Sequence, residues 1–176
     1  MRSDQTARDD LIETMQFLHG RGWCDGTGGN FSVCLQHDPL QLLMAPSGVD
    51  KGSVQAEELI VVDANGAVTD GNGRASAETE LHLCIMSSVG AGAVLHTHSV
   101  AATVLSRVHG CDGFVQLEGW EMLKGLNGIK SHETTLAIPV VANNQNMQQL
   151  SASVKPHLHG PAWGILVEGH GLYAWG

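Results

Sequence analysis

Charged residues are scarce in this chain of 176 residues, and acidic residues outnumber basic ones two to one. Charged residues make up 15% of the sequence, below the roughly 25% that is typical of globular chains. The 9 basic and 18 acidic residues give a formal charge of −9. This charge disfavours binding to nucleic acid or to an anionic membrane surface. It does not exclude an anionic small-molecule substrate, because a pocket can differ in sign from the whole surface.

Extended apolar segments are absent as well. No stretch approaches the roughly 18 consecutive apolar residues of a membrane-spanning helix. The first ten residues, MRSDQTARDD, lack the apolar core of a secretory signal, so we expect a cytoplasmic protein without a membrane segment. The four cysteines form no CxxC motif, and we expect them to be reduced thiols that serve mostly in packing. They are Cys24, Cys34, Cys84 and Cys111.

The apolar residues that are present predict one domain over residues 1–176, since 43% of the chain is hydrophobic and no linker divides it. Helical spacing and short apolar runs predict an irregular alternation of helices and strands. The helices are expected over 4–20, 76–89 with Ser76 as N-cap, 100–108 and 144–154. The strands are expected within 26–35, 41–45, 59–63, 91–99, 114–118, 137–142 and 163–176, the last as two strands around a glycine turn. This order predicts an α/β or α+β fold with helices packed on a central sheet.

Histidine is abundant, with 10 residues against 9 lysines and arginines together, and this directs attention to a metal site. The sharpest motif is His96-Thr97-His98, which follows the apolar residues of a predicted strand. Residues i and i+2 of a strand point the same way, so the two imidazoles share one face and offer two nitrogen ligands. A third ligand has to come from elsewhere. A lone HxH pair is also typical of two surface histidines at the end of a strand.

Three further histidines are candidate ligands, namely His170 and the rival pair in His157-Leu158-His159. His170 lies in the turn Glu168-Gly169-His170-Gly171, where the flanking glycines allow a close approach of the backbone. An ordinary polar hairpin tip has the same pattern. His157 and His159 lie between two prolines in a connecting loop, and we expect them to be exposed to solvent.

Two acids and three small-residue turns complete the candidates. Glu78 begins a predicted helix, where a glutamate often only complements the helix dipole. Glu121 lies among apolar neighbours, which raise the pKa of a carboxyl group and suit it to acid–base work, although an exposed helix glutamate would look the same. Turns at 26–30, 45–48 and 75–76 offer free N–H groups to a phosphate, with Lys51 nearby, yet none matches a known nucleotide-binding motif.

Taken in order, the motifs GTGGNFS, APSGV, SAETELH, HTHS and GHG make the chain similar to the class II aldolase/epimerase/dehydratase family. The resemblance extends from about residue 10 to the end of the sequence. Within this family, the segments EMLKG and HGLYAWG resemble the dehydratases more than the sugar-phosphate aldolases or epimerases. Chains of the family usually continue past HGLYAWG into a further helix, whereas this sequence ends at Gly176.

The resemblance implies one Zn²⁺ per subunit, held by His96, His98 and His170, and Glu121 as the catalytic acid/base. Glu78 matches a glutamate near the metal of the aldolases, so the resemblance implies an accessory role for it. Lys51, which adds charge near the turns, is a second accessory candidate. The family fold is a three-layer arrangement with a central, mostly antiparallel sheet and helices on both faces. Members are usually homotetramers with sites at subunit boundaries. The residues implied to bind the substrate phosphate are Gly28, Gly29, Asn30, Ser47, Gly48 and Ser76.

Three functions are compatible with this resemblance. The first is dehydration of a ketose phosphate, in which the metal polarises the C2 carbonyl while an acid/base removes the C3 proton and expels the C4 hydroxyl. The second is an aldolase or 4-epimerase that acts on another sugar phosphate with the same metal site. The third is a metal-free interaction module like the adducin head domain, which the presence of all three histidines disfavours.

Overall fold

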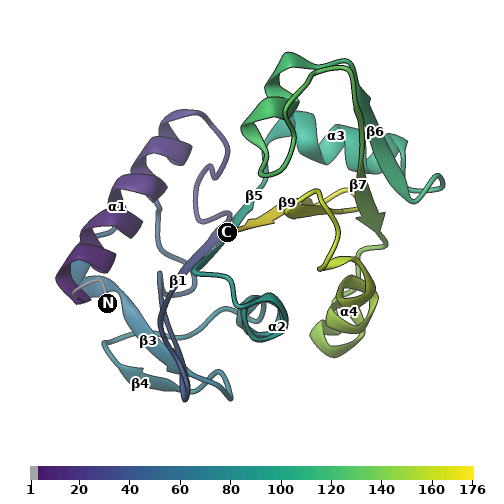
Figure 1. Ribbon diagram of the computed structural model, residues 1–176. Helices are drawn as coiled ribbons and strands as arrows, with labels where there is room; N and C mark the ends of the chain where they lie inside the picture. The colour runs from purple at the N-terminus through teal and green to yellow at the C-terminus, as the bar shows by residue number, and fades with distance from the viewer. Residues whose placement is uncertain (1–3) are drawn as a thin grey trace.

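The computed structural model describes residues 4–176, which form one sheet covered by helices on both faces (Figure 1). The strands are β1 (Asn30–His37), β2 (Leu40–Met44), β3 (Ile60–Asp63), β4 (Val68–Asp70), β5 (Ala93–Thr97), β6 (Phe114–Glu118), β7 (Thr135–Val141), β8 (Gly164–Val167) and β9 (Gly171–Trp175). The helices are α1 (Asp4–Gly20), α2 (Thr79–Val89), α3 (Val100–Val108) and α4 (Met147–Val154), with the 3-10 turns η1 (Ala56–Glu58), η2 (Glu121–Gly125) and η3 (Lys155–His157).

The sheet has the strand order β4-β3-β2-β1-β5-β9-β8-β7-β6. Among the described strands, only the β7–β8 pair is parallel, and every other neighbouring pair is antiparallel. The parallel pair needs a crossover connection, which α4 provides. The predicted central, mostly antiparallel sheet is therefore confirmed.

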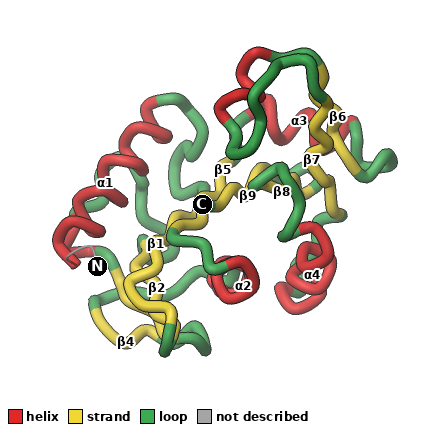
Figure 2. The backbone as a smooth tube through the Cα atoms, viewed as in Figure 1, coloured by secondary structure: helices red, strands yellow, loops and turns green. Residues whose placement is uncertain are grey.

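Neighbouring residues on one strand point to opposite faces of the sheet and so pack under different helices. On β2, Leu42 packs with the cluster that contains the buried residues of α2 and α4, whereas Leu43 packs with the buried face of α1. On β9, Tyr173 belongs to the α2 and α4 cluster, and Leu172 packs on the other face near Ala102 of α3. Helices α1 and α3 thus cover one face and α2 and α4 the other, as the tube in Figure 2 shows, which confirms the three-layer expectation.

Most elements lie where the sequence predicts them, with two differences at helix starts. Helix α2 begins at Thr79, so Ser76 is not its N-cap; the hydroxyl of Ser76 instead accepts a hydrogen bond from the backbone N–H of Glu78. Helix α4 begins at Met147 because the side chain of Asn146 caps it by accepting from the N–H of Gln149. The sequence prediction missed β4, a three-residue exposed strand with no apolar pattern.

Two predictions on composition can be compared with the described residues 4–176. All four cysteines are free, as expected. No helix within this range is long and apolar enough to cross a bilayer.

Candidate metal centre and substrate cleft

Three histidines meet at the carboxyl end of β5. The Nε2 atom of His96 lies 2.8 Å from Nε2 of His98 and 3.3 Å from Nε2 of His170. All three residues offer ring nitrogens within 4.8 Å of one another. The structure therefore brings together the HxH pair and the glycine-flanked histidine, which are 72 residues or more apart in the sequence (170 against 98).

The pairing of β5 with β9 explains this convergence. Thr97 at the end of β5 lies opposite Leu172 at the start of β9, so the turn that precedes β9 is placed beside the HxH pair. Gly171 makes the close approach that this requires, because a Cβ atom there would lie 2.1 Å from the carbonyl oxygen of Thr97. The hydroxyl of Thr103 in α3 holds the turn by donating to the carbonyl of His170 at 3.1 Å.

The ring of His96 is fixed on both sides. Its Nδ1 lies 3.1 Å from the carbonyl oxygen of Leu172, which can only accept, so Nδ1 carries the proton. Its Nε2 lone pair therefore points towards the other two histidines. The ring of Tyr173 stacks on His96 with centroids 3.9 Å apart and an interplanar angle of 10°. A metal-ligating histidine is usually oriented by this kind of backbone contact.

Two of the histidines, His96 and His98, have pKa values lowered in the direction that favours the neutral, metal-binding form. Burial lowers the pKa of His96 well below its usual value, and the neighbouring His170 and His98 lower it further. Burial also lowers the pKa of His98, with additional effects from His170 and the ammonium group of Lys51. Neutral imidazole is the ligand form, so these shifts favour metal binding at neutral pH.

The spacing of the nitrogen atoms fits a small divalent cation. Metal–nitrogen bonds of about 2.0–2.1 Å in a tetrahedral site put the nitrogen atoms about 3.3 Å apart. The separation between His96 and His170 has this value, and that between His96 and His98 is somewhat shorter. Since both the donor type and the spacing fit, these three residues form a candidate metal site.

Glu78 is the fourth member of the cluster. Its carboxylate oxygens lie 3.3 Å from Nε2 of His170 and 3.8 Å from Nε2 of His96. The side-chain amide of Asn30 donates a hydrogen bond to the same carboxylate. Glu78 directly precedes α2, but its side chain faces the histidines, so it does more than complement the helix dipole.

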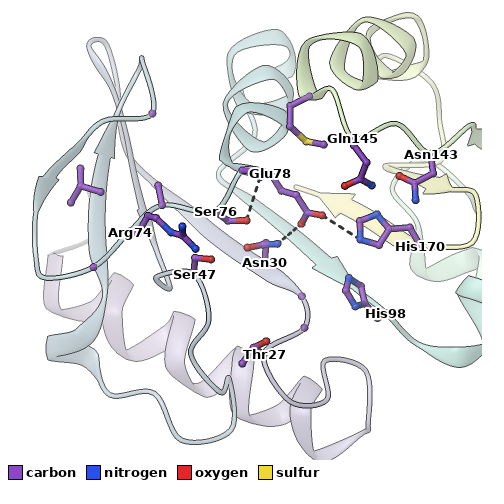
Figure 3. A pocket seen from close by; sticks show the side chains of 18 residues that line it. Thr27, Asn30, Ser47, Arg74, Ser76, Glu78, His98, Asn143, Gln145 and His170 are labelled. Atoms are coloured by element: carbon purple, nitrogen blue, oxygen red, sulfur yellow. Dashed lines mark hydrogen bonds and ion pairs between the residues drawn. The ribbon is translucent and has the colours of Figure 1, made fainter.

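A cleft of about 970 Å³ opens in front of these residues (Figure 3). Asn30, Ser76 and Glu78 lie between the histidines at one end and Ser47 at the other. Of the predicted phosphate-binding residues, the cleft is lined by Gly28, Gly29, Asn30, Ser47 and Ser76, and Gly48 is the one that does not line it. The turns that the sequence analysis singled out therefore surround the same space as the metal candidates.

Lys51 does not line this cleft. It is almost fully buried, and its ammonium group donates to the backbone carbonyls of Thr27 and Val49 at 3.1 and 2.9 Å. It therefore joins the turn at 26–30 to the turn that follows Ser47. Burial lowers the pKa of Lys51.

Glu121 lies apart from the histidines. It begins η2, its side chain is 66% exposed, and it pairs with Lys124 and, at 3.5 Å, with His132. It does not line the cleft of the described chain, so its catalytic role remains a prediction. His157 and His159 are exposed, as expected.

The sequence analysis missed several residues that line the cleft. They include Arg74, Asn143 and Gln145. Arg74 had a usable signal, since it directly precedes the predicted turn at Ala75-Ser76. Asn143 and Gln145 had none, because they lie in a polar loop whose position depends on the tertiary fold.

The chain matches the class II aldolase and adducin N-terminal domain family over residues 9–176. It belongs to this family, and the resemblance inferred from the motifs is confirmed.

Two relatives are similar over most of their length. A methylthioribulose-1-phosphate dehydratase of Sorangium cellulosum is 43% identical over 171 residues, which cover 95% of this chain and 80% of the relative. One of Marinobacter nauticus is 40% identical over 174 residues, covering 97% of this chain and 83% of the relative.

Solved structures share the fold at lower identity. YgbL from Escherichia coli superposes with a TM-score of 0.83 at 23% identity, covering 99% of this chain and 80% of that chain. An L-fuculose 1-phosphate aldolase superposes with a TM-score of 0.77 at 24% identity, covering 99% of this chain and 76% of that chain. These superpositions confirm the class II aldolase-like fold.

Proposed function

We propose that this chain removes water from 5-methylthioribulose 1-phosphate to give 2,3-diketo-5-methylthiopentyl 1-phosphate, a step of methionine salvage. The observation that supports it most is the convergence of His96, His98 and His170 beside a cleft lined by serine and glycine turns. Two relatives at 43% and 40% identity have the name of this dehydratase. We place the reaction in the cytoplasm, which agrees with four free cysteines.

We assign Zn²⁺, one per subunit, to the three histidines. Imidazole nitrogen is a preferred zinc ligand, and three protein ligands leave a position open for substrate. When bound, the ion supplies Lewis-acid polarisation of the C2 carbonyl, which acidifies the proton at C3. Glu78 contributes negative charge beside His170 and His96.

The remaining chemistry is proton transfer by a carboxylate. The carboxylate removes the proton from C3, and the carboxylic acid so formed protonates the C4 hydroxyl, which leaves as water. The resulting enol tautomerises to the 2,3-diketone. We assign this role to Glu121, and the resemblance of EMLKG to the dehydratases supports the assignment.

Because Glu121 does not line the cleft beside the histidines, we infer that the site is shared between subunits. The neighbours of Glu121 are unusually exposed for large apolar side chains, with Trp120 at 60% and Met122 at 80%. The outer face of α3 is apolar as well, with Val100 at 75% and Val108 at 67% exposure. Exposed large apolar side chains that are grouped on one element in this way mark a candidate association site. We propose a homotetramer in which η2 of one subunit brings Glu121 to the histidines of the next.

A second candidate function is aldol cleavage, and the position of Glu78 favours it. A carboxylate 3.3 Å from a metal-ligand candidate can deprotonate a substrate hydroxyl within one subunit, which is what cleavage between C3 and C4 requires. The interaction-module alternative has no comparable support, because such a module needs no convergent histidines.

The test is incubation of the zinc-loaded protein with 5-methylthioribulose 1-phosphate. Dehydration yields the diketone, whereas cleavage between C3 and C4 yields dihydroxyacetone phosphate, and mass spectrometry distinguishes the two products. We expect the diketone. Release of dihydroxyacetone phosphate would instead identify an aldolase, and the absence of both products would refute the assigned substrate.

A further inference from the structure

Arg74 is the one lysine or arginine that lines the cleft in the part of the chain that the structure describes. Within residues 4–176 its guanidinium group forms no ion pair, whereas Arg8 and Arg107 each pair with a carboxylate. Figure 3 shows Arg74 beside Ser47, with Ser76 lying between Arg74 and Glu78. An unpaired cation in a cleft of a chain with formal charge −9 indicates that the cleft receives an anion.

The backbone of Arg74 is firmly positioned even though its side chain is exposed. Its carbonyl accepts a hydrogen bond of 2.8 Å from the N–H of Ser47, which joins the two small-residue turns. Gly73 packs directly on Pro46, since a Cβ atom at Gly73 would lie 2.7 Å from Cβ of Pro46. The guanidinium group therefore extends from a fixed point at the edge of the cleft.

Lys51, the cation suggested by the sequence, cannot serve the same purpose. Its ammonium group is buried and already donates to two backbone carbonyls. Among the lysines and arginines of residues 4–176, Arg74 is therefore the one placed to meet an anion in the cleft.

We infer that Arg74 binds the phosphoryl group of the substrate together with the hydroxyl groups of Ser47 and Ser76. A guanidinium group offers a planar pair of N–H donors that matches two phosphate oxygens, and a dianion gains more from this pairing than a neutral sugar does. This inference rests on the proposed function and sets the direction of the substrate. The C1 phosphate lies at the Arg74 end, so C2 and C3 lie towards His98 and His170.

The experiment compares the zinc-loaded wild type with the variants Arg74→Gln and Arg74→Lys. Lys155→Gln is the control, because it removes one positive charge from an exposed position outside this cleft. Two quantities are measured: KM and kcat for 5-methylthioribulose 1-phosphate, and the binding of inorganic phosphate by calorimetry. Zinc content and circular dichroism verify that each variant is folded and loaded.

We expect Arg74→Gln to raise KM and weaken phosphate binding by roughly 10- to 100-fold, the value of a hydrogen bond to a charged group. In Arg74→Lys, KM and phosphate affinity should both lie between those of the wild type and Arg74→Gln. The lysine keeps the charge but loses the planar pair of donors. Wild-type KM and phosphate affinity in Arg74→Gln would overturn the inference. A wild type that makes no diketone would refute the proposed function instead, and phosphate calorimetry would still decide the role of Arg74.

Discussion

Tyr173 and His96 stack in parallel, with ring centroids 3.9 Å apart, although 77 positions separate them in the sequence (173 against 96). They lie opposite each other on the paired strands β5 and β9. Tyr173 is fully buried and also meets the ring of His82 edge to face at 5.8 Å. The buried core on this face of the sheet therefore supports His96 directly. Substitutions that change the packing of this core should change the affinity for metal.

We predict that Tyr173→Leu weakens zinc binding by roughly 10- to 100-fold, the usual effect of losing a group that orients a ligand. Tyr173→Phe is the matched control, because it keeps the stacked ring and loses only the hydroxyl. Competition with a chromogenic chelator measures both affinities. Equal zinc affinity in the wild type and Tyr173→Leu would show that the stack does not orient His96.

His98→Ala should lose nearly all of its zinc. Three nitrogen ligands are the minimum for a tight catalytic zinc site, and two do not hold the ion against dialysis. His157→Ala is the control, because His157 is exposed in a loop outside the cluster. Elemental analysis of the purified variants gives the answer. Full zinc occupancy in His98→Ala would refute the assignment of the site.

His82 should make the metal-free protein sensitive to acid. It is fully buried, and burial lowers its pKa from 6.5 to about 3. The unfolded state therefore binds a proton below pH 6.5 that the folded state does not bind, so stability falls as the pH falls through this range. From about pH 7 to about pH 5 the loss attributable to His82 is roughly 2 kcal/mol.

Urea unfolding of the chelator-treated protein at the two pH values measures this loss. His82→Leu removes the titrating group and should show a loss that is smaller by about that amount. His96 also has a lowered pKa and remains in both proteins, so the comparison isolates His82. An identical loss of stability in the wild type and His82→Leu would contradict the prediction.

The sequence predicted the metal cluster better than it predicted its surroundings. His96 and His98 share a face because of the strand period alone, and the glycines around His170 indicated a close approach that Gly171 indeed makes. The charge on Lys51 was visible, but its burial was not, because burial depends on how two distant turns pack. Arg74 precedes a predicted turn in the sequence, but its position in the cleft depends on the pairing of its carbonyl with Ser47 in a distant turn.

Glu121→Gln should retain zinc and bind substrate while kcat falls by about 10²- to 10⁴-fold, the usual contribution of a general acid–base group. The substitution preserves size and removes the titratable proton at an exposed position, so the fold is not at risk. Glu78→Gln is the comparison. If Glu78→Gln is inactive and Glu121→Gln is near wild type, the proton-transfer role belongs to Glu78 and the site is aldolase-like.

Mixed oligomers test whether Glu121 acts on a neighbouring subunit. The variants His98→Ala and Glu121→Gln should each be nearly inactive alone, the first without metal and the second without the acid/base. In a hybrid, the histidines of a Glu121→Gln subunit can meet Glu121 of a His98→Ala subunit. That site is complete, because each variant supplies the group that the other lacks.

Equal amounts of the two variants, unfolded and refolded together with zinc, should therefore regain activity. Random assembly in a closed ring makes about a quarter of the sites complete, so up to that fraction of wild-type activity is expected. Each variant refolded alone is the control for restored folding. If Glu121 and the histidines of one subunit formed the site together, every site in the mixture would lack one group. No activity would then return. A mixture as inactive as its components would therefore exclude the shared site.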